Sequence, residues 1–116
     1  RQMCIRDRDE VVLMLCLDSM GRVISCTELG RGVVNSVGTS IRRIVETALK
    51  NKAASVILAH NHPEGFAIPS KEDEAVTKKI SASLDMVGIT LADHLVIAGD
   101  DFVSFRDSGL LGAYGY

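Results

Sequence analysis

The chain has 116 residues, 47% of them hydrophobic and 4% aromatic, which predicts a single domain with a core of aliphatic side chains. Its formal net charge is −2 with both signs interspersed, and this balance disfavours a broad surface for nucleic acid or for an anionic membrane. No apolar run approaches the roughly 20 residues of a membrane-spanning helix, and no signal peptide is visible, so we expect a cytoplasmic protein.

The beginning of the chain predicts a β-hairpin. Residues 1–9 are mostly polar and lack periodicity, and we expect a truncated or non-native start, with the domain over residues 10–116. The continuous apolar run Val11–Leu17 is typical of a strand that is buried on both faces. Turn residues at 18–21 lead into a second predicted strand over residues 22–27, so the two strands are expected to pair.

A short third strand over residues 33–37 and an amphipathic helix are predicted next. Ser40 is a favourable N-cap residue, and the helix is expected to end near Asn51. The apolar stripe of this helix has the spacing i, i+3, i+4, i+7, i+8 and consists of Ile41, Ile44, Val45, Ala48 and Leu49. Residues 54–59 are small and apolar, which indicates a central strand.

A second helix and two more strands complete the pattern. The helix is predicted to begin near Lys71 and to end at Gly88, a favourable C-cap residue. Strands are predicted over residues 94–98 and 102–105, with a turn between them. The order β-β-β-α-β-α-β-β predicts an α/β domain with a mixed sheet flanked by helices. In such domains the chemistry usually lies at the carboxyl ends of strands.

His60 and His62 are the strongest candidates for metal ligands. Histidines at i and i+2 on an extended backbone point to the same side, so one cation could accept both imidazoles. The alternative is a pair of polar loop residues that bind no metal. The complete string His-x-His-Pro-x5-Pro-Ser-x-x-Asp favours metal ligation over that alternative.

Asp73 is the expected third ligand, although a second interpretation competes for its carboxylate. Ser70 and Asp73 have the spacing of a capping box, in which the acid would satisfy backbone donors at a helix N-terminus. A carboxylate in the first turn also projects toward the preceding loop, where the histidines lie. Glu64 is a rival ligand, but chelation two residues after His62 would strain the loop. Three protein ligands leave a fourth zinc position open, which is typical of a catalytic site.

A zinc hydrolase also needs a general base and a group that stabilises the transition state. Glu10 abuts the buried strand and is slightly preferred as the base over Glu28. Glu46 is expected to form a surface pair with Lys50, four residues later. Ser70 is either an N-cap alone or a hydroxyl that points into the site.

Asp93 and His94 open one of the late strands. Adjacent Asp and His residues most often form a structural hydrogen-bonded pair, and this is the favoured interpretation here. The alternative is a supporting role beside the metal ligands.

Two sequence motifs resemble those of a known family. The strings His60-Asn61-His62-Pro63-Glu64-Gly65 and Pro69-Ser70-Lys71-Glu72-Asp73 resemble the JAMM signature of the MPN/JAB metalloprotease superfamily. They are most similar to the RadC-like (DNA repair protein RadC) branch, whose strings read HNHPSG and PSxxD. The resemblance covers about residues 10–110. Glu64 departs from that pattern, because it stands where the branch has serine.

The resemblance implies a three-layer, cytidine-deaminase-like α/β fold with one Zn²⁺ ion. It assigns His60, His62 and Asp73 as ligands, Ser70 as the residue that stabilises the tetrahedral intermediate, and Glu10 as the general base. The implied reaction is hydrolysis of a peptide or isopeptide bond by metal-bound water. The name of the branch suggests a link to DNA repair, which none of these residues demonstrates.

Three functional classes follow from these patterns. The first is a zinc metallopeptidase that acts on a peptide or protein substrate, as a monomer or a homodimer. The second is a non-catalytic MPN-type module that assembles with DNA-processing or mobile-element proteins, for which a full ligand set would be unnecessary. The third, a nucleobase deaminase, would require His-x-Glu with Pro-Cys-x-x-Cys. The chain has His62 in place of that acid and contains no Cys-x-x-Cys pair, so we set the deaminase aside.

Overall fold

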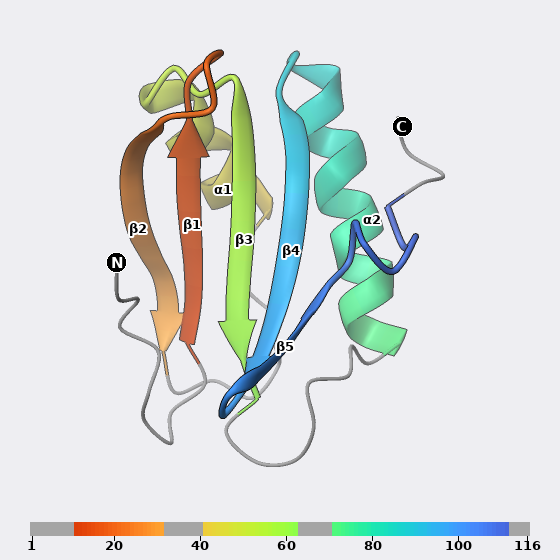
Figure 1. Ribbon diagram of the computed structural model, residues 1–116. Helices are drawn as coiled ribbons and strands as arrows, with labels where there is room; N and C mark the ends of the chain where they lie inside the picture. The colour runs from red at the N-terminus through yellow and green to blue at the C-terminus, as the bar shows by residue number, and fades with distance from the viewer. Residues whose placement is uncertain (1–10, 32–40, 63–70, 112–116) are drawn as a thin grey trace.

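The computed structural model describes residues 11–31, 41–62 and 71–111 of the chain. In chain order they form β1 (Val11–Leu17), β2 (Val23–Arg31), α1 (Ile41–Lys50), β3 (Ser55–Asn61), α2 (Lys71–Met86), β4 (Thr90–Ala98) and β5 (Asp101–Ser104) (Figure 1). Apart from the strand expected over residues 33–37, which lies outside the described ranges, every predicted element is present. The strands β2 and β3 end four and two residues later than predicted, and β4 begins four residues earlier.

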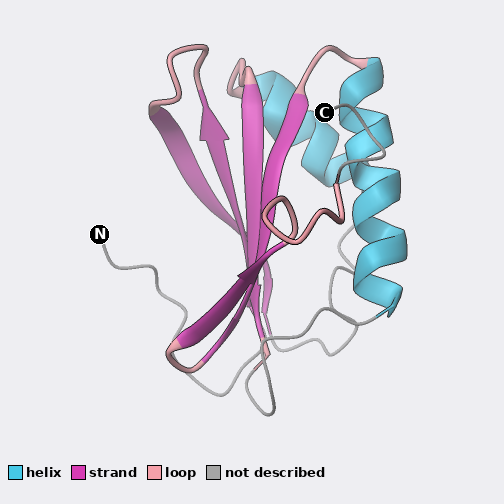
Figure 2. Cartoon of the chain, turned by 45° about the vertical axis from the view of Figure 1, so that its right-hand side comes forward, coloured by secondary structure: helices cyan, strands magenta, loops and turns pink. Residues whose placement is uncertain are grey.

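The five strands form one mixed sheet in the order β2-β1-β3-β4-β5. β1 pairs antiparallel with β2 and β3, whereas β3 and β4 are parallel and are connected through α2. Both helices pack on the same face of this sheet (Figure 2). The predicted mixed α/β fold is therefore confirmed. Of the three expected layers, the described residues form two, namely the sheet and the helical layer.

The hairpin between β1 and β2 closes through a local network at Asp18. Its carboxylate oxygen Oδ1 accepts hydrogen bonds from the backbone amides of Met20 and Arg22, both at 2.9 Å. Gly21 adopts a φ of +82°, a left-handed conformation that costs a side-chain-bearing residue energy. This turn chemistry closes the hairpin that the sequence pattern predicted.

The core lies between the sheet and the two helices. Helix α1 contributes Ile44 and Ala48, and α2 contributes Ile80 and Leu84, all with no exposed surface. Leu49, the last residue of the predicted α1 stripe, is half exposed. The expected surface pair of Glu46 is also different, because its carboxylate bonds Arg42, four residues earlier, instead of Lys50.

Gly88 follows the end of α2, and β4 begins two residues later. Gly88 has a φ of +81°, and its amide bonds the carbonyl of Asp85 at 3.0 Å. The next amide, that of Ile89, bonds the carbonyl of Leu84 at 2.9 Å, so the last carbonyls of the helix are satisfied as at a glycine C-cap. Neither of the two described helices is long and apolar enough to cross a membrane.

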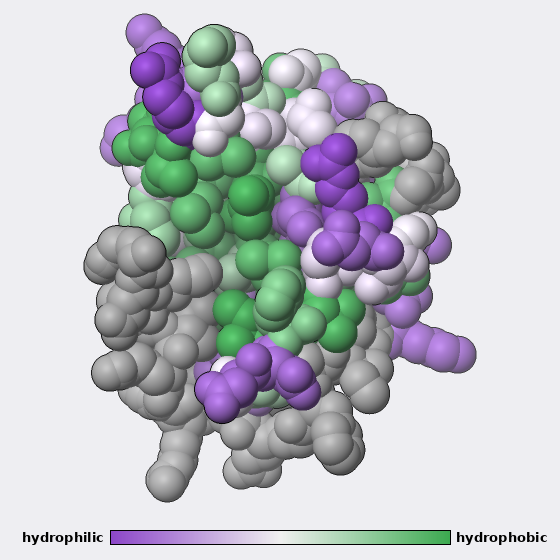
Figure 3. All heavy atoms as spheres, viewed as in Figure 1, coloured by the Kyte–Doolittle hydropathy of each residue, from purple (hydrophilic) through white to green (hydrophobic). Residues whose placement is uncertain are grey.

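Strand alternation sets which side chains face the helices. Val12, Met14 and Cys16 of β1 belong to the core, so the intervening residues point to the opposite face of the sheet. On that face apolar side chains gather over the strands, as Figure 3 shows in the view in which the strands lie in front of α1. Val12 pairs with His60 of β3, which places the first histidine on the helical side of the sheet.

Candidate metal centre

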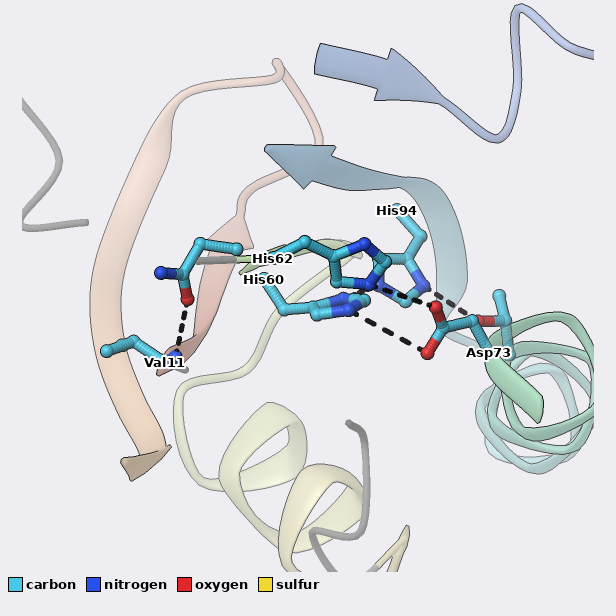
Figure 4. Close-up of polar contacts among 7 residues, drawn as sticks. Val11, His60, His62, Asp73 and His94 are labelled. Atoms are coloured by element: carbon cyan, nitrogen blue, oxygen red, sulfur yellow. Dashed lines mark hydrogen bonds and ion pairs between the residues drawn. The ribbon is translucent and has the colours of Figure 1, made fainter. Parts of the chain in front are cut away.

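His60 and His62 lie at the carboxyl end of β3, and Asp73 lies in the first turn of α2. The side chains of His60 and Asp73 are completely buried, whereas that of His62 is 21% exposed. The backbone amide of His62 bonds the carbonyl of Ile97 at 2.7 Å, which ties the end of β3 to β4. The strand and the helix that follows it therefore bring the three predicted ligands together, and their side chains converge in Figure 4.

The distances between these side chains fit one shared cation. One donor atom from each residue can be chosen so that all three lie within 4.8 Å of one another. His60 Nε2 lies 3.7 Å from Asp73 Oδ1, and His62 Nε2 lies 3.4 Å from Asp73 Oδ2. Zinc–ligand bonds of about 2.1 Å at the tetrahedral angle separate neighbouring ligand atoms by about 3.4 Å. Two imidazoles and one carboxylate also match the ligand types that zinc accepts, so the residues fit the ion.

The buried environment keeps His60 in the form that a metal requires. Burial lowers the pKa of His60 from 6.5 to about 4, while the charge of Asp73 opposes that shift and His62 adds to it. At neutral pH the ring is therefore uncharged and has one nitrogen lone pair available. A metal ligand must be in this neutral form, because a protonated imidazole has no lone pair to donate.

The direction of the Asp73 side chain bears on the choice between a metal ligand and a helix-capping acid. Both carboxylate oxygens lie within 4 Å of an imidazole Nε2, so the side chain is directed at the histidines. Ser70, Glu64 and Glu10 lie outside the described residues, and their assigned roles stay predictions.

His94 contacts a candidate metal ligand, and the sequence pattern did not specify this position. Its Nε2 lies 3.0 Å from Nδ1 of His60, and its Nδ1 lies 2.7 Å from the hydroxyl of Thr77 on α2. Burial lowers the pKa of His94 from 6.5 to about 3, and His60 is the next largest cause. The ring stacks on Phe105 with centroids 4.6 Å apart and planes 14° from parallel. The supporting role beside the ligands, the less favoured interpretation from sequence, thus has direct geometric support.

Asp93 makes a hydrogen bond to its neighbour, but through the backbone. Its Oδ1 accepts from the amides of His94 at 2.7 Å and of Arg106 at 3.0 Å. Its Oδ2 accepts from the hydroxyl of Ser104 at 2.6 Å. The carboxylate therefore links β4 to the end of β5, while the imidazole of His94 contacts His60, a candidate metal ligand.

The described residues include Glu28, one of the two main candidates for a general base, and Val11, the residue after the other candidate. Glu28 pairs with Leu13, the residue after Val12, so it lies on the sheet face opposite His60. Val11 directly follows Glu10, and its amide donates a 2.6 Å hydrogen bond to Oδ1 of Asn61. Asn61 stands between the two histidines, so the start of β1 is anchored beside the candidate metal centre (Figure 4).

The sequence of this chain matches a known protein family and several known proteins. The family model of the RadC-like JAB domain matches residues 1–110. The chain is 43% identical over 104 residues to a UPF0758 protein of Pseudoalteromonas translucida, covering 90% of this chain and 46% of that protein. It is 47% identical over 108 residues to a UPF0758 protein of Aeromonas hydrophila, covering 92% and 48% respectively. The chain thus spans less than half the length of these curated relatives.

Proposed function

The chain belongs to the RadC-like JAB domain family, and we propose that it is a zinc-dependent hydrolase that cleaves a peptide or isopeptide bond in a protein substrate. The observation that carries this proposal is the convergence of His60, His62 and Asp73, whose donor atoms lie within 4.8 Å of one another. A site with three protein ligands retains a coordination position for water or substrate, as catalytic zinc sites do. The partial exposure of His62 supports access from solvent at this position.

The proposed mechanism assigns each step to a group of this chain. His60 and His62 would hold the ion through Nε2, and the charge of Asp73 would partly offset its positive charge. When bound, zinc supplies a Lewis acid that lowers the pKa of water toward about 7. The Glu10 carboxylate takes the proton from the attacking water and passes it to the leaving amine. The Ser70 hydroxyl donates a hydrogen bond to the oxyanion of the tetrahedral intermediate.

The assignment of Glu10 draws support from its neighbours in the chain. Sequence adjacency keeps Glu10 one residue from an amide that is hydrogen-bonded to Asn61, between the two histidines. Glu28, by contrast, projects from the far face of the sheet. The register therefore favours Glu10 over Glu28 as the base.

Metal content of two isosteric variants tests the site itself. We expect about one zinc ion per chain in the purified parent and loss of that ion in Asp73→Asn, which removes the charge but keeps the shape. Asp93→Asn is the matched control, because Asp93 bonds backbone amides and Ser104 and should leave zinc binding unchanged. A parent chain that binds no zinc, or an Asp73→Asn variant that retains it fully, would overturn the proposal.

A second pair of variants tests the reaction. Turnover of quenched fluorogenic peptides and lysine-linked isopeptides is expected to fall at least about 100-fold in Glu10→Gln, as is typical when a general base is lost, while zinc content stays unchanged. Glu28→Gln should retain parental turnover. A zinc-loaded parent that cleaves none of these substrates would favour the alternative, a non-catalytic module that assembles with other proteins.

A further inference from the structure

A continuous hydrogen-bonded chain of side chains leads from the candidate metal centre into the core. Thr77 on α2 contacts His94 on β4 at 2.7 Å, and His94 contacts His60 on β3 at 3.0 Å. His60 and His94 have no exposed surface, and Thr77 is 1% exposed. Three different elements thus meet in one buried polar chain that ends on a candidate metal ligand, and Figure 4 labels the two histidines of this chain.

This chain has only two self-consistent directions, because each neutral imidazole has one protonated nitrogen and one bare nitrogen. In the first, His60 Nδ1–H donates to His94 Nε2, and His94 Nδ1–H donates to the Thr77 hydroxyl oxygen. In the second, the Thr77 hydroxyl donates to His94 Nδ1, and His94 Nε2–H donates to His60 Nδ1. Both directions carry the same number of protons.

Only the first direction allows His60 to bind a cation. It leaves Nε2 of His60 bare, and that nitrogen is the one that faces Oδ1 of Asp73 at 3.7 Å. In the second direction Nε2 carries the proton and has no lone pair for a metal. The first direction also requires an acceptor for the His94 Nδ1–H proton, and the Thr77 oxygen, at 2.7 Å, is placed to be that acceptor.

We propose that His94 and Thr77 are positioning residues that hold His60 in the tautomer whose Nε2 lone pair faces the metal ion. The proposal rests on the proposed zinc site, but it concerns groups that do not touch the ion. Stacking of His94 on Phe105, with ring planes 14° from parallel, fixes the plane of the His94 ring between its two partners. Because Thr77 lies one helical turn after Asp73, α2 supplies both a ligand and the end of this chain.

Zinc affinity of conservative Thr77 variants tests the proposal. Thr77→Val keeps the shape but removes the hydroxyl that lies 2.7 Å from Nδ1 of His94. We expect zinc binding to weaken about 10- to 100-fold in a chelator competition, as is typical for outer-shell partners. Thr77→Ser should restore affinity. Ser81→Ala is the matched control, because Ser81 is another buried hydroxyl of α2, one turn further along. A Thr77→Val chain that binds zinc within about twofold of the parent overturns the proposal.

Nitrogen-15 NMR of the histidine rings provides a second test. It reports which ring nitrogen carries the proton, and it uses the unaltered chain, so no substitution can perturb the fold. With Zn²⁺ bound, we expect protons on Nδ1 of both His60 and His94. A proton on Nε2 of His94 in the zinc-bound form would overturn the proposal. A parent that binds no zinc would refute the metal site and this proposal together, whereas normal zinc binding with the other tautomer would refute this proposal alone.

Discussion

Lowering the pH below about 6.5 should destabilise the metal-free protein, at pH values that are still above the pKa of most carboxylates. Burial lowers the pKa of His60 from 6.5 to about 4 and that of His94 from 6.5 to about 3. Below pH 6.5 the unfolded chain binds protons at these residues and the folded chain does not, so the free energy of unfolding falls as the pH falls. The loss ends near pH 4 for His60 and near pH 3 for His94.

Between pH 7 and pH 5 this linkage amounts to about 2 kcal/mol for each histidine and about 4 kcal/mol for the pair. Such a loss is comparable to the whole stability of a marginal domain. Urea unfolding followed by circular dichroism, with a chelator present throughout, measures it. Asp18 also has a lowered pKa, but its contribution is lost only near and below 3.8, outside this pH range.

A matched variant isolates the contribution of one ring. His60→Gln removes one of the two buried imidazoles, so its free energy of unfolding should fall by only about 2 kcal/mol between pH 7 and pH 5. If the parent loses no stability over this range, or if His60→Gln loses as much as the parent, the assignment of neutral buried histidines is wrong.

Three further substitutions, with Met86→Ala as an exposed control, test the fold around the site by urea unfolding. Asn61→Ala removes the acceptor of the Val11 amide and should cost about 1 to 3 kcal/mol; no loss would show that this bond does not anchor β1. Gly88→Ala places a side chain at a φ of +81° in open space, so only backbone strain of about 1 to 2 kcal/mol is expected, and a neutral result would contradict the left-handed cap. Leu58→Ala should cost about 2 to 5 kcal/mol because Leu58 is completely buried, whereas Met86→Ala, at an 86% exposed position, should stay within about 0.5 kcal/mol.

Local patterns were sufficient to predict most of the fold. Helix α1 follows from apolar residues three and four positions apart, and the hairpin turn follows from Asp18 and Gly21. Both signals depend on neighbours in sequence, which a pattern can record directly. The candidate ligand group could also be predicted, because Asp73 follows His62 by only 11 positions in the sequence.

Contacts between distant segments could not be predicted in the same way. The hydrogen bond of His94 to His60 depends on the parallel register of β3 and β4, in which Leu58 pairs with His94 and His60 pairs with Val96. Alternation indicates which side chains share a face of one strand, but it does not fix how far two strands slide past each other. The position of Thr77 requires in addition the rotation of α2 against the sheet. A pattern in the sequence therefore identified the candidate ligands, but it did not show that His94 and Thr77 lie against His60 in one hydrogen-bonded chain.

The burial of this site has an energetic consequence that links metal binding to stability. Asp73 is completely buried, and the neighbouring His60 is held neutral, so that ring does not offset the negative charge of the carboxylate. Removing a charge from water costs several kcal/mol unless an opposite charge lies beside it. A divalent cation among the three ligands would supply that charge at the point where strand β3 and helix α2 meet. A cation that binds the folded chain and not the unfolded chain should therefore raise the free energy of unfolding by mass action, by an amount that grows with the concentration of free metal.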